Sequence, residues 1–338
     1  MSPRNPEEKE LMQNIPYRSA IGALMYLTVA TRPDIACSTA TSARYMTNPG
    51  QEHWTSVKRA FRYLQGNLTL GLVFDCSTNC DILECFSDSD WAADQDGRRS
   101  TTGYVVYLYG CAISWKSKLQ KTVAHSSTEA EYYAMSDTAR EVMWLRGLMK
   151  ELGIEENSNS TATPVHTTIK KERDVKKDVT EQNYKQYIPA TGEPTELCSI
   201  QPTELSNAAP TVMLADNQGA IQLAKNPVNH ERTKHIDIKH HYIRERVQDN
   251  AIDPVYVHTK LNDSDIFTKT TCTTEEFILC RDRVMGYDQS ARVARHEDRE
   301  AERAATPRQI IKRAKMNKSQ ATAKKKAAKA TKDAKGAL

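Results

Sequence analysis

The 338-residue sequence contains no apolar run of the roughly 18 to 20 residues that a membrane-spanning helix requires. Residues 1–10 are polar and charged, so we expect no secretory signal peptide. The eight cysteines lack the paired spacing of a zinc site or a disulfide framework, which favours free thiols in a reducing compartment. These absences predict an intracellular protein of the cytoplasm, the nucleus or both, with no membrane partner.

Acidic residues are scarce at the end of the chain, so the net charge of +4 is distributed unevenly along the sequence. Residues 303–338 contain twelve Lys or Arg and a single acid, Asp333, which is a net of +11 and leaves −7 for residues 1–302. We therefore interpret residues 288–338 as a disordered, basic, low-complexity tail centred on Lys324, Lys325 and Lys326. Such a tail attracts nucleic acid without sequence preference, or is only a solvated arm.

Residues 1–75 have a helical pattern. Ala, Leu and Met are frequent in 17–28 and 38–45, and the intervening Pro33 disfavours helix in the residue before it. Residues 52–65 carry apolar side chains at spacings of three and four, which predicts an amphipathic helix. We expect a helical subdomain that needs a partner to pack against.

The hydrophobic period changes after residue 76, and residues 76–287 read as one α/β domain. Short apolar runs at 82–86, 103–109 and 111–115 predict an antiparallel meander, and Ser126, Ser127 and Thr128 offer caps for a helix ending near Leu152. A strand at 211–215, helices at 217–225 and 233–248, a strand at 252–258 and a closing helix from Asp263 complete the order β-β-β-α-β-α-α-β-α. Residues 154–210 lack periodicity, and we interpret them as a flexible insertion.

Four carboxylates occupy strand ends or helix starts in this domain: Asp88, Glu129, Asp216 and Asp265. If the first strand is central and the strand at 211–215 lies parallel beside it, all four acids lie near one edge of the sheet. Like charges this close repel strongly at low dielectric, so the cluster requires bound cations. Carboxylate oxygens are the ligands of Mg²⁺ or Mn²⁺, and two such ions support phosphodiester cleavage.

These acids lie in motifs that follow one another in a fixed order. The motifs are Phe86-Ser87-Asp88-Ser89-Asp90-Trp91-Ala92, Arg99 to Tyr104, Ser114 to Lys118, Ser126 to Tyr132, Asp216-Asn217-Gln218, Thr233 to Asp237 and Asp265 to Lys269. Together they resemble the ribonuclease H domain of copia-type (Pseudoviridae) retrotransposon Pol polyproteins. Residues 17–35 resemble the end of the reverse transcriptase that precedes this domain.

The resemblance implies an RNase H-like mixed five-stranded sheet flanked by helices, behind a helical remnant of reverse transcriptase. It implies two-metal hydrolysis of the RNA strand of RNA–DNA hybrids by Asp88, Glu129, Asp216 and Asp265, which would bind two Mg²⁺ or Mn²⁺ ions. Ser127, Asn217 and Gln218 flank these acids and are expected to touch the minor groove, where the ribose 2′-OH distinguishes RNA from DNA. The sequence has no Tyr-x-Asp-Asp motif, so we expect no polymerase activity.

Other interpretations remain open at this point. The chain is alternatively a catalytically inactive retroelement relic that acts at most as a nucleic-acid-binding module; an integrase or transposase is disfavoured because Glu129 follows the third strand. Asp90, Asp94 and Glu131 are rivals whose neighbours favour surface positions. The histidines at 230, 235, 240 and 241 and His258 read as surface residues, and the tryptophans at 91, 115 and 144 as core residues.

Overall fold

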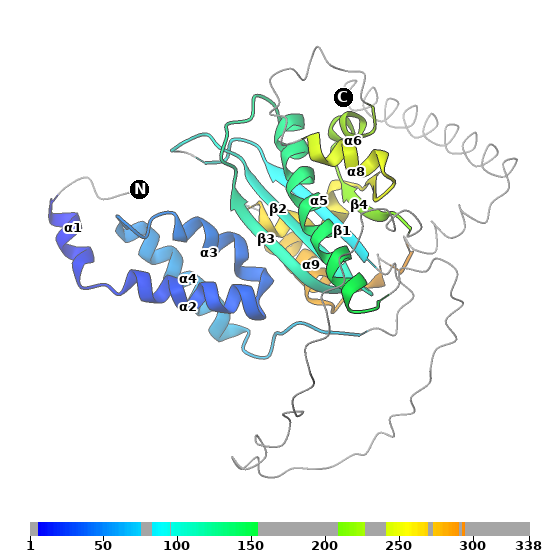
Figure 1. Ribbon diagram of the computed structural model, residues 1–338. Helices are drawn as coiled ribbons and strands as arrows, with labels where there is room; N and C mark the ends of the chain where they lie inside the picture. Colours follow the sequence, from blue (N-terminus) through cyan, green and yellow to red (C-terminus); the bar gives the residue numbers. More distant parts are fainter. Residues whose placement is uncertain are drawn as a thin grey trace, which may run out of the picture.

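A mixed five-stranded sheet forms the centre of the computed structural model (Figure 1). The structure describes residues 6–75, 83–94, 96–154, 209–226, 241–269, 273–290 and 293–294. The strands are β1 (Leu83–Asp90), β2 (Thr101–Leu108), β3 (Cys111–Leu119), β4 (Thr211–Ala215) and β5 (Ile252–Tyr256). Their spatial order is β3-β2-β1-β4-β5. β1 to β3 form an antiparallel meander, whereas β4 is parallel to β1 and β5 is parallel to β4.

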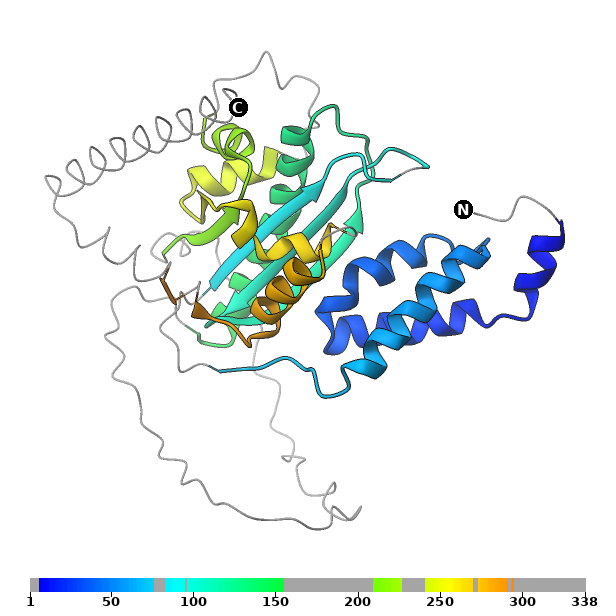
Figure 2. The ribbon, with the colours of Figure 1, turned by 180° about the vertical axis from the view of Figure 1, so that it is seen from behind.

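Helices cover both faces of this sheet, as the two opposite views show (Figures 1 and 2). One face packs against α5 (Ser127–Glu151), α6 (Gln218–Lys225) and α8 (Tyr242–Gln248). The other face packs against the 3₁₀ helix η5 (Asp263–Phe267) and α9 (Thr274–Met285). Because β1 is central and covered on both sides, even its polar residues Ser87, Asp88 and Ser89 are buried.

This mixed sheet with its flanking helices confirms the predicted RNase H-like α/β fold, and the order of the described elements agrees with the prediction. One element differs: the predicted closing helix from Asp263 is a short 3₁₀ helix followed by the separate helix α9. Asn262 caps η5 by accepting from the Ser264 amide at 3.2 Å, and Thr273 begins α9 with a capping box to Glu276. Local capping therefore divides one predicted helix into two.

Some predictions fall outside the described residues. These are most of the insertion at 154–210, nearly all of the basic tail, and residues 233–240 of the predicted helix at 233–248. Helix α8 begins only at Tyr242 in the described part of that segment.

The N-terminal residues form the expected helical subdomain. Its elements are α1 (Pro6–Gln13), α2 (Tyr17–Ala30), the 3₁₀ helix η1 (Pro33–Ile35), α3 (Ala36–Ala43) and α4 (Gln51–Gly66). The chain breaks at Pro33 as predicted, and α1 is a further helix within residues 1–75 that the ranges named from the sequence did not include. Ile21 and Leu24 of α2 pack against Val57 and Leu64 of α4 in a small core of their own.

This subdomain packs against the sheet domain at the edge strand β3 and at α9. The indole Nε1 of Trp115 on β3 donates to the Thr28 carbonyl at 2.8 Å. The rings of Tyr63 on α4 and Phe277 on α9 meet edge to face, with centroids 5.8 Å apart. The helical subdomain therefore finds in the sheet domain the partner that its sequence requires.

A buried ion pair lies where η1 approaches α4. The guanidinium of Arg32 donates to both carboxylate oxygens of Asp34, at 3.0 and 2.7 Å, and the Tyr63 hydroxyl donates to the same carboxylate at 2.7 Å. The side chain of Asp34 is fully buried and that of Arg32 is 7% exposed. A bidentate geometry with a third donor satisfies both charges without water.

Among the helices that the structure describes, none combines the length and the apolar character that crossing a bilayer demands.

Replacing Asp34 tests this ion pair. Asp34→Ala leaves the buried Arg32 charge unpaired, so we expect a loss of about 3–5 kcal/mol in the free energy of unfolding, measured by chemical denaturation. Asp137→Ala removes the exposed partner of Arg140 and serves as the matched control, with an expected change below about 1 kcal/mol. Equal effects of the two changes would contradict the assignment.

Candidate metal centre

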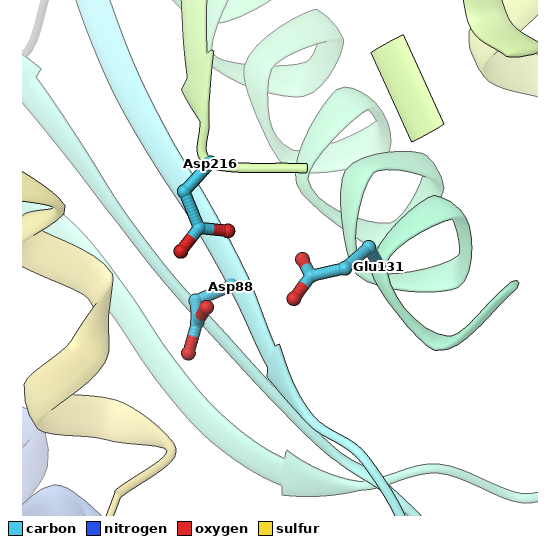
Figure 3. A group of neighbouring side chains, drawn as sticks. All are labelled: Asp88, Glu131 and Asp216. Carbon is cyan, nitrogen blue, oxygen red and sulfur yellow. The ribbon is translucent and has the colours of Figure 1, made fainter. Parts of the chain in front are cut away.

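Three carboxylates converge at one edge of the sheet. Asp88, Glu131 and Asp216 each offer an oxygen atom, and these atoms all lie within 4.8 Å of one another. Figure 3 shows Asp88 on β1, Asp216 just beyond β4 and Glu131 on α5 directed toward a common point. Asp88 and Glu131 are buried, and Asp216 is partly exposed. Closely spaced carboxylate oxygens of this kind form a ligand set for hard divalent cations.

The topology of the sheet brings these acids together. β1 and β4 are parallel neighbours with Phe86 opposite Leu214, so Asp88 and Asp216, each two residues further on, lie side by side where β4 ends. α5 crosses the same edge at its N-terminus, where the Ser126 hydroxyl accepts from the Glu129 amide. The first turns of α5 are therefore held above the end of β1, and Glu131 reaches the two aspartates.

Hydrogen bonds orient the two aspartates. The Thr268 hydroxyl donates to Oδ2 of Asp88, and the Thr259 hydroxyl donates to Oδ2 of Asp216 at 2.7 Å. Both threonines come from the segment that follows β5. This segment therefore holds the carboxylates on β1 and β4 in fixed orientations.

Burial and mutual repulsion disfavour the charged forms of these acids. Burial and the negative charge of Asp265 raise the pKa of Asp88 to about 7. Burial, with the charges of Asp88 and Asp216, also raises the pKa of Glu131 well above its usual range. A bound cation reverses this penalty, because it favours the ionised carboxylates.

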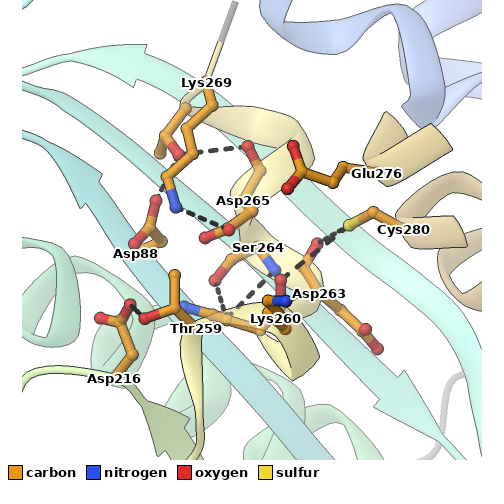
Figure 4. Close-up of polar contacts among 12 residues, drawn as sticks. Asp88, Asp216, Thr259, Lys260, Asp263, Ser264, Asp265, Lys269, Glu276 and Cys280 are labelled. Atoms are coloured by element: carbon orange, nitrogen blue, oxygen red, sulfur yellow. Dashed lines mark hydrogen bonds and ion pairs between the residues drawn. The ribbon is translucent and has the colours of Figure 1, made fainter. Parts of the chain in front are cut away.

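Asp265, on η5, lies beside the acid cluster (Figure 4). Its carboxylate forms an ion pair with the ammonium group of Lys269. Its Oδ2 accepts from Nζ of Lys269 at 2.6 Å, whereas Oδ1 is buried without a partner among the described residues. Burial raises the pKa of Asp265 to about 6. Burial lowers the pKa of Lys269, but the carboxylates of Asp88 and Asp265 outweigh it and raise that pKa overall.

The structure does not bring Glu129 into this group, although the sequence interpretation named it as a ligand. Its carboxylate is buried and points back along its own segment. It accepts from the His125 amide at 2.7 Å and from the Tyr133 hydroxyl. The geometry gives Glu129 a local capping role, and whether it takes part in metal binding stays a prediction.

Glu131 was expected on the helix surface, and this expectation is wrong, because its side chain is buried against the sheet. Helical periodicity carried a signal that could have identified it. Glu131 precedes the buried residues Ala134, Met135 and Thr138 by three, four and seven positions and so shares their face. Glu129 lies two positions earlier and is rotated by about 200°.

The residues that were expected to contact nucleic acid differ in exposure and in hydrogen bonding. Ser127 and Gln218 are exposed at the starts of α5 and α6. Asn217 caps α6, because its side-chain oxygen accepts from the Ala220 amide at 3.0 Å. Lys324, Lys325 and Lys326 lie outside the described residues.

Three other expectations about side chains are wrong. Trp91 and Trp144 are 51% and 62% exposed and are not core residues. Asp94 is buried and paired with Arg44 and Arg99, so it is not solvent-facing. The burial of Asp94 depends on packing with residues distant in sequence, such as Arg44, whereas Trp91 and Trp144 are not covered in this way.

The residues present fit divalent cations. Oε2 of Glu131 and Oδ1 of Asp265 are buried and have no hydrogen-bond partner among the described residues. Unsatisfied buried carboxylate oxygens are costly unless a cation or a donor fills the site. An all-oxygen donor set suits Mg²⁺ or Mn²⁺ better than zinc.

Fold and site together define an RNase H-like protein with a cluster of acids at the end of its central strand. The retrovirus-related Pol polyprotein from transposon TNT 1-94 of Nicotiana tabacum is 38% identical over 284 residues, which cover 84% of this chain and 17% of that protein. The corresponding polyprotein from transposon RE2 of Arabidopsis thaliana is 36% identical over 253 residues, 75% of this chain and 14% of that protein.

The chain belongs to the retrovirus-related Pol polyproteins of copia-type transposons. It spans less than a fifth of the length of these relatives. The secreted RxLR effector protein 161 of Plasmopara viticola is also similar, 47% identical over 134 residues that cover 40% of this chain and 94% of that protein. No protein-family model matches the chain.

The raised pKa of Asp88 predicts how stability depends on pH. The folded pKa of about 7 lies above the ordinary value of 3.8, so the folded state binds this proton more tightly. The resulting stability is fully present below about pH 4 and is lost as pH rises through about 7. In EDTA we expect the Tm of the native chain, relative to that of Asp88→Asn, to fall between pH 5 and pH 8.

Addition of Mg²⁺ provides the complementary measurement, since the ion binds ionised carboxylates. We expect Mg²⁺ to raise the Tm more at pH 8 than at pH 5, and to do so much less in Asp88→Asn. A Tm difference between the two chains that does not change with pH would contradict the inference that buried Asp88 is protonated in the metal-free protein.

Proposed function

We propose that this chain is a ribonuclease H that hydrolyses the RNA strand of RNA–DNA hybrids, leaving 3′-hydroxyl and 5′-phosphate ends. The observation that carries the proposal is the convergence of Asp88, Glu131 and Asp216 within 4.8 Å at the end of the central strand. Membership in the Pol polyproteins, which contain enzymatic domains, supports it. The proposal includes no polymerase activity for this segment.

In this proposal Asp88, Glu131 and Asp216 hold two Mg²⁺ or Mn²⁺ ions together with Asp265. When bound, such ions activate the attacking water and stabilise the leaving oxygen. The side chains of the protein supply position and charge. Thr268 and Thr259 fix the rotamers of Asp88 and Asp216, and burial of Asp88 and Glu131 limits the access of bulk water to the acids.

Lys269 balances charge in the proposed site. Its ammonium, 2.6 Å from Oδ2 of Asp265, reduces the repulsion among the four acids when cations are absent. The free Oδ1 of Asp265 remains available to a cation on the other side of the carboxylate.

The hybrid is proposed to approach over the starts of α5 and α6. Ser127 and Gln218 are exposed there. The side-chain oxygen of Asn217 caps α6, and its side-chain nitrogen takes no part in that cap. Hydroxyl and amide groups read the minor groove of a hybrid, where the ribose 2′-OH identifies the RNA strand. This placement supports a preference for the RNA strand.

Two glutamates on one helix provide the decisive test. We expect Glu131→Gln to reduce Mg²⁺-dependent cleavage of a labelled RNA–DNA hybrid by more than about 100-fold, because it removes a charged ligand. Glu129→Gln should keep cleavage within about 10-fold and lower the free energy of unfolding by about 1–3 kcal/mol, because it weakens buried hydrogen bonds. Asp88→Asn serves as the inactive reference.

The opposite ranking, with Glu129→Gln inactive and Glu131→Gln active, would show that Glu129 is the metal ligand, as the sequence interpretation expected. If Asp88→Asn cleaved the hybrid as fast as the native chain, the proposal would be refuted. Salt-dependent hybrid binding that is lost on deleting residues 303–338, with no cleavage by the native chain, would favour the nucleic-acid-binding relic.

The basic tail is proposed to increase the affinity for nucleic acid without contributing to catalysis. Removing residues 303–338 deletes a net charge of +11, including Lys324, Lys325 and Lys326. We expect weaker hybrid binding and a shallower dependence of log Kd on log salt, because fewer counterions are released. The kcat should remain within about twofold, and a salt dependence unchanged by the deletion would contradict this role.

A further inference from the structure

The loop between β1 and β2 begins three residues after Asp88 of the proposed metal centre. It follows Asp90, the last residue of β1, and returns to β2 at Thr101. Two of its residues that are not glycine, Ala92 and Arg98, have φ angles of 56° and 51°, in the left-handed region. Such conformations persist only where surrounding contacts enforce them. Contacts are therefore expected to hold the described residues of the loop, 91–94 and 96–100.

The first residue of this loop, Trp91, bridges the two elements that carry Asp88 and Glu131. Its indole Nε1 donates to the Ala124 carbonyl at 3.2 Å, in the segment that leads into α5. The donor of the side chain is thus satisfied by protein, while 51% of the residue remains exposed. An indole that is fixed at its nitrogen and half exposed suits a surface contact better than a core position.

Buried Asp94 holds the loop. Its backbone carbonyl accepts from the Arg98 amide at 2.8 Å, and its Oδ2 accepts from the Gly97 amide at 3.0 Å. Asp94 also pairs with Arg99 at 3.8 Å and, across the subdomain boundary, with Arg44 at 3.5 Å. Arg44, at the end of α3, donates in addition to the Thr101 hydroxyl at 3.2 Å. The helical subdomain thereby contacts the loop at Asp94 and the start of β2 at Thr101.

The two chain segments that contain Trp91 and its hydrogen-bond partner Ala124 carry a net positive charge although residues 1–302 carry −7. The loop 91–100 and the segment 116–126 contain five Lys or Arg and two acids, a net of +3. One of the acids, Asp94, is already neutralised by arginines. The side chains of Arg98, Lys116, Lys118 and Lys121 are exposed. A half-exposed indole in a region with these exposed cations suits a nucleic acid, since phosphates bind the cations and a sugar ring of the backbone can pack on the indole.

We infer that Trp91 contacts the RNA–DNA hybrid, packing its indole face against a nucleotide next to the cleavage site, and that Arg44 is a positioning residue that holds the loop through Asp94. This inference rests on the proposed function, which supplies the identity of the bound duplex. It gives the N-terminal helices a part in substrate binding that the sequence did not indicate.

A purely structural latch is the competing explanation for Trp91, and the two explanations rank substitutions differently. If Trp91 acts through its Nε1 donor, Trp91→Phe and Trp91→Leu lose the same hydrogen bond and are equally harmful. If the ring face binds substrate, Trp91→Phe keeps most of the contact whereas Trp91→Leu loses it.

Steady-state cleavage of a labelled RNA–DNA hybrid in Mg²⁺ separates these explanations. For Trp91→Leu we expect KM to rise about 10-fold, which corresponds to about 1.4 kcal/mol, with kcat nearly unchanged, since leucine loses the ring contact with the substrate. Trp91→Phe should stay within about threefold of the native KM. Trp144→Phe is the matched control: Trp144 is 62% exposed on α5, thirteen residues and about 20 Å beyond Glu131.

A second measurement requires no turnover. In an Asp88→Asn background, addition of hybrid should quench tryptophan fluorescence, and Trp91→Phe should remove most of that quenching while Trp144→Phe should not. Arg44 is tested by a double-mutant cycle. Arg44→Ala should raise KM, Arg44→Lys should restore part of the loss, and Arg44→Ala combined with Trp91→Leu should be no worse than Trp91→Leu alone.

Equal KM values for the native chain and Trp91→Leu, with unchanged quenching in Trp91→Phe, would overturn the inference while leaving the proposed function intact. Additive effects of Arg44→Ala and Trp91→Leu would remove Arg44 from its positioning role. A native chain that cleaves no hybrid would refute the proposed function instead, and the quenching measurement would still decide whether Trp91 binds nucleic acid.

Discussion

The burial of carboxylates at the end of the central strand is the constraint on which the rest of this structure depends. Asp88 and Glu131 are removed from water, and Asp216 and Asp265 lie beside them. Such an arrangement is unfavourable for the folded apoprotein, because desolvation and mutual repulsion both oppose ionisation. The protein meets this cost locally, with hydroxyl donors from Thr259 and Thr268 and the tethered ammonium of Lys269. What these groups leave unsatisfied is the part of the site that a divalent cation fits.

The helical subdomain and the sheet domain contact each other through side chains that neither segment reveals alone. Trp115 on the edge strand donates to a carbonyl of α2, Tyr63 meets Phe277, and Arg44 reaches the loop beyond β1. The edge strand β3 is thereby partly covered, which protects unpaired backbone groups from other chains. The same contacts connect the N-terminal helices to the rim of the acidic site. Stability and the proposed substrate binding therefore draw on one interface.

Local patterns predicted much of this architecture, and the differences have identifiable physical causes. The meander, the long helix α5 and the strand before Asp216 follow from periodicity and turn residues, as does the break at Pro33. The sequence could not show that Asn262 and Thr273 divide the closing segment into η5 and α9, because the competing caps differ little in energy. Asp94 was expected at the surface because its partner Arg44 lies fifty residues away. Trp91 was expected in the core because tryptophan usually is.

The sequence by itself determined the order of the elements, the RNase H-like fold class and the neighbourhood in which the acids would gather. Tertiary structure decided which glutamate faces Asp88. Glu129 and Glu131 lie two positions apart on one helix, and local propensity treats them alike. The rotation of α5 about its axis, set by the packing of Ala134, Met135 and Thr138 on the sheet, directs Glu131 toward the aspartates and leaves Glu129 to the His125 amide and Tyr133. That rotation is a property of the packed core, and so a single helix cannot specify it.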